Sequence, residues 1–387
     1  MAKNADVVVI GAGLAGLSAT LELQSQGVDV VLLEASDRTG GRVASDYIDG
    51  FICDRGFQLI NSRYPSLIEL DVLDEIDFVL APRVIEVSLG TSRHIAGDPR
   101  KAPLSTLDKA TGTIPEKFAL LRFLLFSAPR AQTIGGALSR FGTLYEHVLR
   151  PFLTGVFLCD PELVDFDYGV LIIKSFVNGA PGVPRSGVGR LPEALAKRVQ
   201  NLELHTRVER IIGQQIETTS GVMNAKKIVV ATDPTTAAQL LDFSAAVSMA
   251  GCITWYHATA SNPSGTGRLI VDGQNRGPII NSVVMSDISI DYSDSSMSLV
   301  SSTSGLGVTE SDARRHLSLI WGCDTREWQL VSKYEIASAL PIHLPGKAFS
   351  QPMKISENIF VAGDHRSVPS QQGALFSGKL VAQLVLN

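Results

Sequence analysis

A glycine-rich turn between a strand and a helix is the feature that most constrains the fold of this chain. The apolar run at residues 7–10 predicts a buried parallel strand. Gly11, Gly13 and Gly16 complete G-x-G-x-x-G where that strand passes into a helix, predicted at residues 14–26. Because a helix N-terminus presents free N–H groups, this segment predicts a βαβ unit with an anion-binding site.

An acidic residue after the next strand indicates which anion would bind. Residues 28–33 predict that strand and place Glu34 at its carboxyl end. A carboxylate there can accept hydrogen bonds from both hydroxyls of a ribose and disfavours a 2′-phosphate. A glycine-rich turn can also serve packing alone, but the strand, the helix and Glu34 together favour a dinucleotide pyrophosphate.

Length and composition limit the classes of protein to which this chain can belong. At 387 residues the chain is large enough for a broad core and an enclosed cavity. A charged fraction of 19% and a net charge of −5 describe a globular protein without a basic field for nucleic acid, so nucleic acid is not an expected partner. The first strand begins close to Met1, which leaves no room for a secretory signal, so we expect a cytoplasmic protein.

The cysteine and histidine spacings indicate neither a disulfide framework nor a metal site. We expect reduced, buried thiols at the four widely spaced cysteines, which are Cys53, Cys159, Cys252 and Cys323. His365 and Arg366 follow a predicted strand and either border the site or lie on a surface loop.

The remainder of the chain divides into alternating segments. Three consecutive segments have the apolar pattern of strands and are predicted to extend the sheet of the nucleotide unit, namely residues 202–211, 214–219 and 227–231. Short alternating runs within residues 247–299 predict an antiparallel sheet in a second domain. Proline and glycine punctuation at residues 178–190 marks a loop at the crossing between domains.

The C-terminal segment resembles a second cofactor-binding element. A short strand is predicted to end at Gly363-Asp364, and a helix opens near Gln371. That helix carries small residues that permit close approach of another helix or of a planar ligand, namely Gly373, Ala374, Ser377 and Gly378. Its N-terminus offers positive potential.

The stretch at residues 117–130, KFALLRFLLFSAPR, has two interpretations. It could lie on a bilayer surface, because an apolar face is flanked by Lys117, Arg122 and Arg130. The alternative is an amphipathic helix that buries its leucines and phenylalanines against its own domain.

Taken together, these pieces resemble the flavoprotein superfamily of amine oxidases, protoporphyrinogen oxidase and phytoene desaturases. The motif matches are the glycine loop with Glu34, the Gly40-Gly41-Arg42 that follows it, Val208, and Gly363-Asp364 with the GALFSG stretch. The resemblance implies non-covalently bound FAD as the cofactor, held by Gly11, Gly13, Leu14, Ala15, Gly16, Glu34, Ala35, Gly41, Arg42, Val208, Gly363, Asp364, Gln372, Gly373 and Ala374.

The resemblance also implies a role for each group of residues. In that superfamily the glycine loop and the Arg42 position hold the pyrophosphate, and the Glu34 position holds the adenine-side ribose. The Val208 position contacts adenine through its backbone, and the Asp364 position approaches the central phosphate and ribityl region. The helix beginning near Gln372 points at the isoalloxazine.

The implied fold class is α/β, with a discontinuous Rossmann-like FAD-binding domain and a second α+β substrate-binding domain. We expect the first to comprise residues 1–75, 190–242 and 346–387, and the second to comprise residues 76–189 and 243–345.

The implied activity is dehydrogenation of an apolar organic small molecule by hydride transfer to the flavin, with oxygen or another electron acceptor. The protoporphyrinogen oxidase and phytoene desaturase branch matches best. Ser370 stands where amine oxidases of the superfamily typically carry an aromatic residue, and the strand within residues 247–258 has no lysine. Lys174 and Lys333 are expected at the surface, and no catalytic base is identified.

Three alternatives stay open. An amine oxidase would need an aromatic cage, and a sugar-nucleotide mutase would need arginines for a diphosphate, for which Arg185 and Arg190 are available. A non-enzymatic nucleotide-binding module would bind FAD without any reducing substrate. Peripheral membrane contact and the oligomeric state also remain open.

Overall fold

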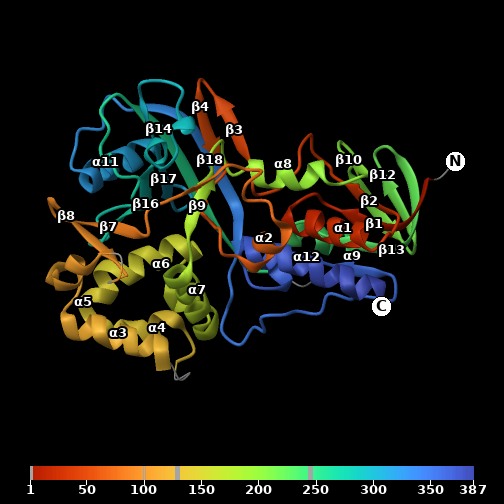
Figure 1. Ribbon diagram of the computed structural model, residues 1–387, viewed down its shortest axis with the longest axis horizontal. Coiled ribbons are helices and arrows are strands. Elements are labelled where there is room, and N and C mark those ends of the chain that lie inside the picture. The colour runs from red at the N-terminus through yellow and green to blue at the C-terminus, as the bar shows by residue number, and fades with distance from the viewer. Residues whose placement is uncertain (1–2, 99, 101, 127–130, 243–246) are drawn as a thin grey trace.

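The computed structural model describes residues 3–98, 100, 102–126, 131–242 and 247–387. These residues are organised around two seven-stranded sheets. The two sheets lie on different sides of the molecule, with the helices of residues 114–178 beneath the second sheet (Figure 1).

The first sheet is a parallel sheet with an antiparallel extension. Its order is β10-β2-β1-β13-β12-β11, and β19 also pairs with β13. The strands are β1 (Lys3–Ile10), β2 (Val30–Leu33), β10 (Leu202–Glu203), β11 (Val208–Ile212), β12 (Gln215–Thr218), β13 (Gly221–Val230) and β19 (Ile359–Val361). All pairs are parallel except β11–β12 and β12–β13. Since its strands come from the N-terminal, middle and C-terminal segments, the predicted discontinuous Rossmann-like unit is confirmed.

Helices α1 (Leu14–Ser25) and α12 (Gln371–Leu386) pack against each other on this sheet at unusually short range. A Cβ at Gly378 would lie 2.1 Å from the carbonyl oxygen of Ala15, so a larger residue there would separate the two helices. The Ser18 hydroxyl donates to the carbonyl of Leu375 at 2.7 Å across the same contact. The small residues of the last helix therefore serve helix packing along this part of their length.

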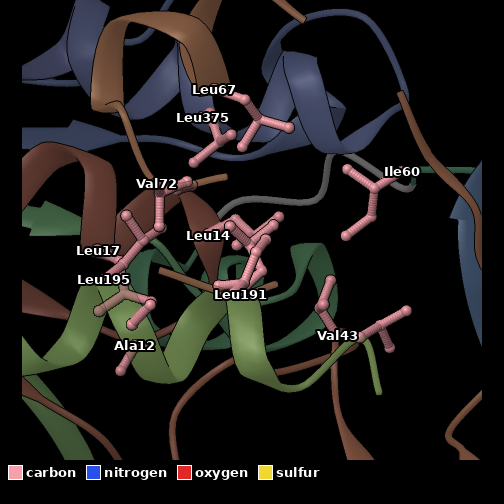
Figure 2. Packing of buried hydrophobic residues seen from close by; sticks show 14 of the residues in the cluster. Ala12, Leu14, Leu17, Val43, Ile60, Leu67, Val72, Leu191, Leu195 and Leu375 are labelled. Carbon is pink, nitrogen blue, oxygen red and sulfur yellow. The ribbon is translucent and has the colours of Figure 1, made fainter. Parts of the chain in front are cut away.

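The core beneath these helices draws on segments from the whole chain. Figure 2 shows side chains from α1, α2 (Pro65–Leu70), α8 (Arg190–Lys197) and α12 meeting in one apolar cluster. The labelled members that are completely buried include Leu17, Leu67, Leu191 and Leu375. Burial of each such side chain stabilises the fold by about 1.5–3 kcal/mol. Helix α9 (Pro234–Leu241) packs against β11 elsewhere on this sheet.

The predicted strand at residues 202–211 is wrong as a single element. Residues 202–203 pair with β2 at one edge, whereas residues 208–212 lie at the opposite edge of the sheet. His205 turns the chain with a φ of +53°, and Thr206 N donates to the carbonyl of Glu34 at 2.8 Å. The connecting segment therefore crosses the carboxyl end of β2, which alternation along the sequence could not indicate.

The second sheet has the order β18-β14-β17-β16-β15-β7-β8, and every pair except β15–β7 is antiparallel. Its strands are β7 (Val84–Leu89), β8 (Ser92–Gly97), β14 (Met249–Thr259), β15 (Ile270–Asp272), β16 (Ile279–Val284), β17 (Ser298–Ser304) and β18 (Gln329–Pro341). Smaller sheets contain β3 (Ser45–Ile48), β4 (Phe51–Asp54), β5 (Ile60–Asn61), β6 (Phe78–Leu80) and β9 (Pro181–Pro184). The serine-rich tract thus contains the strand expected in it, and a hairpin occupies residues 45–54.

Helices complete the second domain. They are α3 (Ile114–Phe126), α4 (Ile134–Leu138), α5 (Gly142–Leu144), α6 (Arg150–Phe157), α7 (Phe166–Asn178), α10 (Met285–Ile288) and α11 (Glu310–Trp321). The helix expected within residues 117–130 is α3, and residues 127–130 lie outside the described residues. In the part of the chain that the structure describes, no helix has both the length and the apolar character needed to cross a bilayer.

Candidate functional site

A cavity of about 780 Å³ lies between the two sheets, at the carboxyl ends of the parallel strands. Ile10 and Leu33 line it where β1 and β2 end, and Ala231 lines it directly after β13. Ligands of open parallel sheets bind at this edge, because the loops diverge there and leave a crevice. The volume is within the range of small-molecule and cofactor sites.

The glycine loop forms one wall of the cavity. Gly11 has a φ of +99°, a conformation that a side chain disfavours, and a Cβ at Gly16 would lie 1.9 Å from the Gly11 carbonyl oxygen. A Cβ at Gly13 would meet no atom within 4 Å, although this residue lines the cavity. Gly16 therefore permits helix and turn to pack, and Gly13 leaves space beside the backbone for a ligand. Leu14 and Ala15 line the same wall.

Glu34 braces this loop while facing the cavity. Its Oε2 accepts a hydrogen bond from Ala12 N at 2.8 Å, and its Oε1 accepts from the amide and hydroxyl of Ser36 at 2.9 and 2.8 Å. These contacts hold the carboxylate at the end of β2, where hydroxyls of a ribose could still reach its remaining lone pairs. Ala35 lines the cavity beside it.

Arg42 and Asp364 meet across the cavity wall as an ion pair. Arg42 Nη2 lies 2.7 Å from Asp364 Oδ1, and Arg42 Nη1 donates to the carbonyl of Ala339 at 2.9 Å. Burial alone would lower the pKa of the Arg42 guanidinium, but the Asp364 carboxylate raises it, so the arginine is charged. Gly41 and Gly363 line the cavity next to this pair.

Three buried polar atoms on the lining lack a partner within the described residues, and all three belong to residues that sequence reasoning missed. One is Thr303 Oγ1 in β17, and the other two lie in the first and last segments of the chain. Arg38 Nη1 is one, and burial together with the nearby Arg55 lowers the pKa of the Arg38 guanidinium. The other is Gln371 Oε1, whose amide nitrogen donates to Gln58 Oε1 at 2.9 Å. A guanidinium with an unpartnered nitrogen and an amide acceptor at a helix N-terminus fit a ligand that has a pyrophosphate and an N–H-bearing ring system, as FAD has.

Three predicted cofactor residues do not belong to the cavity lining. Gly16 lies behind the loop, as described above. Gln372 points to α2 instead, where its Nε2 donates to the Ser66 hydroxyl at 2.9 Å and its Oε1 accepts from Ser66 N at 3.1 Å. A Cβ at Gly373 would lie 1.8 Å from the Val368 carbonyl oxygen, so this glycine permits the turn before α12. Ala374 and Val208 do line the cavity.

A large part of the cavity lining, which we call the uncharged wall, consists of uncharged residues. It carries five aromatic side chains from distant segments, which are Phe57, Tyr64, Phe152, Tyr168 and Phe176. Among the described residues, the lining contributed by residues 57–64, 152–181 and 252–340 contains no acidic or basic side chain. Its polar members include Asn61, Ser175, Cys252, Asn281 and Thr303.

The titratable groups on that wall are neutral. Burial raises the pKa of the Tyr168 phenol, whose hydroxyl donates to the carbonyl of Pro369 at 3.0 Å. Burial also raises the pKa of the Cys252 thiol to about 11. Lys333 pairs with Glu335 at 3.0 Å and Lys174 is exposed, so neither lysine faces the cavity.

His365 is buried directly behind the cavity wall. A Cβ on Gly363 would lie 2.5 Å from the His365 ring, and burial lowers the pKa of His365 to about 4. The imidazole is therefore neutral at pH 7, and it borders Gly363 as one of the two sequence interpretations proposed. Among the described residues, no cluster of histidine, cysteine and carboxylate groups could hold a metal ion.

Comparison with known proteins places this geometry in context. The profile of the family "flavin containing amine oxidoreductase" matches residues 14–386. Putrescine oxidase of Kocuria rosea is 41% identical over 93 residues, which are 24% of this chain and 18% of that protein. The curated relatives compared here are matched over only 7% to 33% of their own length.

Solved structures show the same fold over nearly the whole chain. An oxidoreductase from Methanosarcina mazei superposes with a TM-score of 0.79 at 14% identity, covering 97% of this chain and 99% of that one. A putative protoporphyrinogen oxidase from Exiguobacterium sp. 255-15 gives 0.74 at 17% identity, covering 100% and 99%. At these identities the likeness concerns the fold.

Proposed function

Because the chain belongs to the flavin-containing amine oxidoreductases, a family of FAD-dependent oxidoreductases, we propose that it dehydrogenates an apolar organic small molecule. FAD is the cofactor of this family. The branch that we favour is the one that includes protoporphyrinogen oxidase and phytoene desaturases. We also propose that the enzyme works in the cytoplasm, a reducing compartment that suits its four free cysteines.

The observation that carries this proposal is the uncharged wall of the cavity. An ammonium or diphosphate group that left water for this wall would find no counter-ion among the described residues of the wall itself. An apolar substrate loses little hydration there and gains contact with the five aromatic side chains. The wall therefore selects for apolar character.

The other half of the cavity holds the cofactor in this proposal. The N-terminus of α1, Arg38 and Arg42 face the pyrophosphate, and Glu34 faces the adenine-side ribose. Val208 lies beside the adenine, and the N-terminus of α12 with Gln371 lies beside the flavin ring. When bound, FAD accepts hydride from a C–H bond and passes the electrons to oxygen or another acceptor.

No titratable group of the uncharged wall accepts the proton at neutral pH, so in this proposal the proton passes to water. Both the Tyr168 phenol and the Cys252 thiol stay protonated at neutral pH, so neither can accept it. His365 is neutral but is no part of the cavity lining. We therefore assign the wall residues to substrate orientation and water exclusion, with no catalytic base among them.

Amine oxidation is the second candidate, because an amine cation could bind against the ring faces of the five aromatic side chains. Ser370, however, lines the cavity where amine oxidases typically carry an aromatic residue. The geometry gives a sugar-nucleotide mutase less support. Arg185 is exposed and Arg190 pairs with Glu193 at 2.7 Å, so neither faces the cavity.

An anaerobic visible spectrum of the purified holoprotein tests these candidates. We expect the flavin absorbance to stay unchanged with putrescine, cyclohexylamine and benzylamine, and to bleach with a porphyrinogen or a polyene. Bleaching by an amine would select the second candidate. Protein that retains no flavin after reconstitution with FAD would refute both.

A further inference from the structure

Helix α3 presents a row of large apolar side chains to solvent. Ile114, Phe118, Leu121 and Leu125 follow one another at intervals of four, three and four residues, which places them on one face. Phe123 is the buried member of this helix, and its ring packs edge-on against Phe141 and Phe166. The expectation that α3 buries its leucines and phenylalanines is therefore wrong for most of them, since one side of the helix suffices for packing.

The turn before α3 adds two leucines to the same surface. The Lys117 ammonium donates to the carbonyls of Ser105 and Asp108 at 2.9 and 2.7 Å, which holds the short helix η1 (Pro103–Leu107) against α3. We define the α3 face as Leu104, Leu107, Ile114, Phe118, Leu121, Leu125 and Phe126, each 51–82% exposed. Soluble proteins rarely leave so many large apolar side chains together in water without a partner for them.

Basic side chains border the α3 face, whereas nearby carboxylates are engaged elsewhere. Lys109, Arg122 and Arg140 are exposed around it. The Glu116 carboxylate accepts from the amides of Thr113 and Thr143 at 2.7 and 3.1 Å, and the Asp108 carboxylate lies 2.7 Å from the His94 ring. With Lys117, the four cations outnumber the Glu116 and Asp108 carboxylates, so the local charge is positive, although the whole chain has a net charge of −5.

We propose that the α3 face docks onto the surface of an anionic lipid bilayer. Its leucines and phenylalanines would enter the boundary between headgroups and acyl chains, while the three cations stay among the phosphates. With 13 residues, α3 is too short to span a bilayer, so it lies in the interface.

The bordering charges favour a membrane over a second copy of the chain. A two-fold contact through the α3 face would bring the basic borders of two copies, with Lys109, Arg122 and Arg140, together, where like charges repel. An anionic surface meets the same cations with attraction. α3 lies at the end of the molecule remote from the first sheet (Figure 1). This inference stands apart from the proposed reaction.

Co-sedimentation of the holoprotein with sucrose-loaded vesicles tests the proposal. We compare phosphatidylcholine vesicles with vesicles that also contain phosphatidylglycerol. The wild type should bind the anionic vesicles, and the double variant Phe118→Ser/Leu121→Ser should lower the partition coefficient at least about tenfold, because two apolar side chains no longer enter the interface. Arg122→Glu should weaken binding to anionic vesicles only.

Ile290→Ser is the matched control, because Ile290 is 75% exposed but lies on another surface. This control should bind as the wild type does. Leu104→Ser provides a second test outside α3 in case the double variant loses its flavin spectrum or its melting temperature falls. Leu104→Ser should also weaken binding.

Two results would overturn the proposal. One is a wild type that binds neither vesicle, or that binds equally well after Phe118→Ser/Leu121→Ser and Leu104→Ser. The other is a stable dimer in sedimentation velocity that these substitutions dissociate, because that would assign the α3 face to a second copy of the chain.

Discussion

The Arg42 guanidinium and the Asp364 carboxylate form a 2.7 Å ion pair across the cavity wall although 322 positions separate them in the sequence. Arg42 follows the double glycine after β2, and Asp364 follows β19 at the other end of the chain. The pair therefore joins two of the segments that build the discontinuous nucleotide domain. It also holds the arginine beside the position that we propose for the pyrophosphate.

Arg42→Gln should weaken FAD binding and also destabilise the protein. The substitution removes a charge-assisted contact to phosphate, so we expect FAD affinity to fall at least about tenfold. It leaves the Asp364 carboxylate buried without its cation, which costs about 1–3 kcal/mol of unfolding free energy. Quenching of flavin fluorescence on titration into apoprotein, together with urea unfolding, measures both effects.

Arg315→Gln is the control for this substitution, since Arg315 forms an exposed ion pair with Asp312 on α11. This variant should match the wild type in both measurements. An Arg42→Gln apoprotein that binds FAD with wild-type affinity would contradict the role that we propose for Arg42.

Gly13→Ala and Gly16→Ala should have opposite effects on folding and cofactor binding. An alanine at position 13 meets no atom within 4 Å, so apoprotein stability should hold while the methyl group occupies space beside the ligand and weakens FAD binding. An alanine at position 16 would lie 1.9 Å from the Gly11 carbonyl oxygen and should cost about 1–3 kcal/mol of stability. Thermal unfolding of both apoproteins separates the two, and equal losses of stability would refute the distinction.

Arg38→Met should stabilise the apoprotein while weakening FAD binding. Its Nη1 atom is buried without a partner among the described residues, so replacing the guanidinium with an apolar side chain removes a desolvation cost. The same replacement removes a cation from the proposed pyrophosphate site. We expect a higher melting temperature without FAD and a smaller increase on adding it. Arg326→Met, at an exposed pair with Asp324, should change neither value.

The buried Asp54 should make stability depend on pH. Burial raises its pKa from 3.8 to about 6, even though the Ser45 hydroxyl, the Tyr292 hydroxyl and the Val188 amide all donate to the carboxylate. Between these two values the folded protein holds a proton that the unfolded chain has released. Stability from this group is therefore greatest below about pH 4 and declines as pH rises to about 6, by about 3 kcal/mol.

Asp54→Asn isolates this contribution because asparagine does not titrate. The difference in unfolding free energy between wild type and variant should change over pH 4–6 in favour of the wild type at the acidic end. Urea unfolding at several pH values measures it. A difference that stays constant over that interval would show that Asp54 titrates normally.

Local patterns predicted the elements that line the cavity on the side where we propose the nucleotide. The Gly11, Gly13 and Gly16 turn, the carboxylate of Glu34 and the helix after Gly363-Asp364 each depend on residues close in sequence, so periodicity and turn chemistry indicated them. Arg38 was missed although it stands between Glu34 and Arg42 in the same motif. Its position between two other candidate site residues was a signal that could have been used.

The sequence could not indicate which side chains at the start of the C-terminal helix face the cavity. Gln372 was expected at the cofactor, but α12 turns Gln371 to the cavity and Gln372 to Ser66. A shift of one residue rotates a helical side chain by about 100°, so a small uncertainty in where the helix begins reverses the assignment.

By itself the sequence determined a strand–turn–helix that can hold a pyrophosphate, an acidic residue for a ribose and a similar element near the C-terminus, because short-range sterics and hydrogen bonding decide these features. Only the tertiary structure decided the ion pair of Arg42 with Asp364, the uncharged aromatic wall and the exposed α3 face. Each of these depends on contacts between residues far apart in sequence, and burial or exposure of a side chain is settled only when the whole chain has packed.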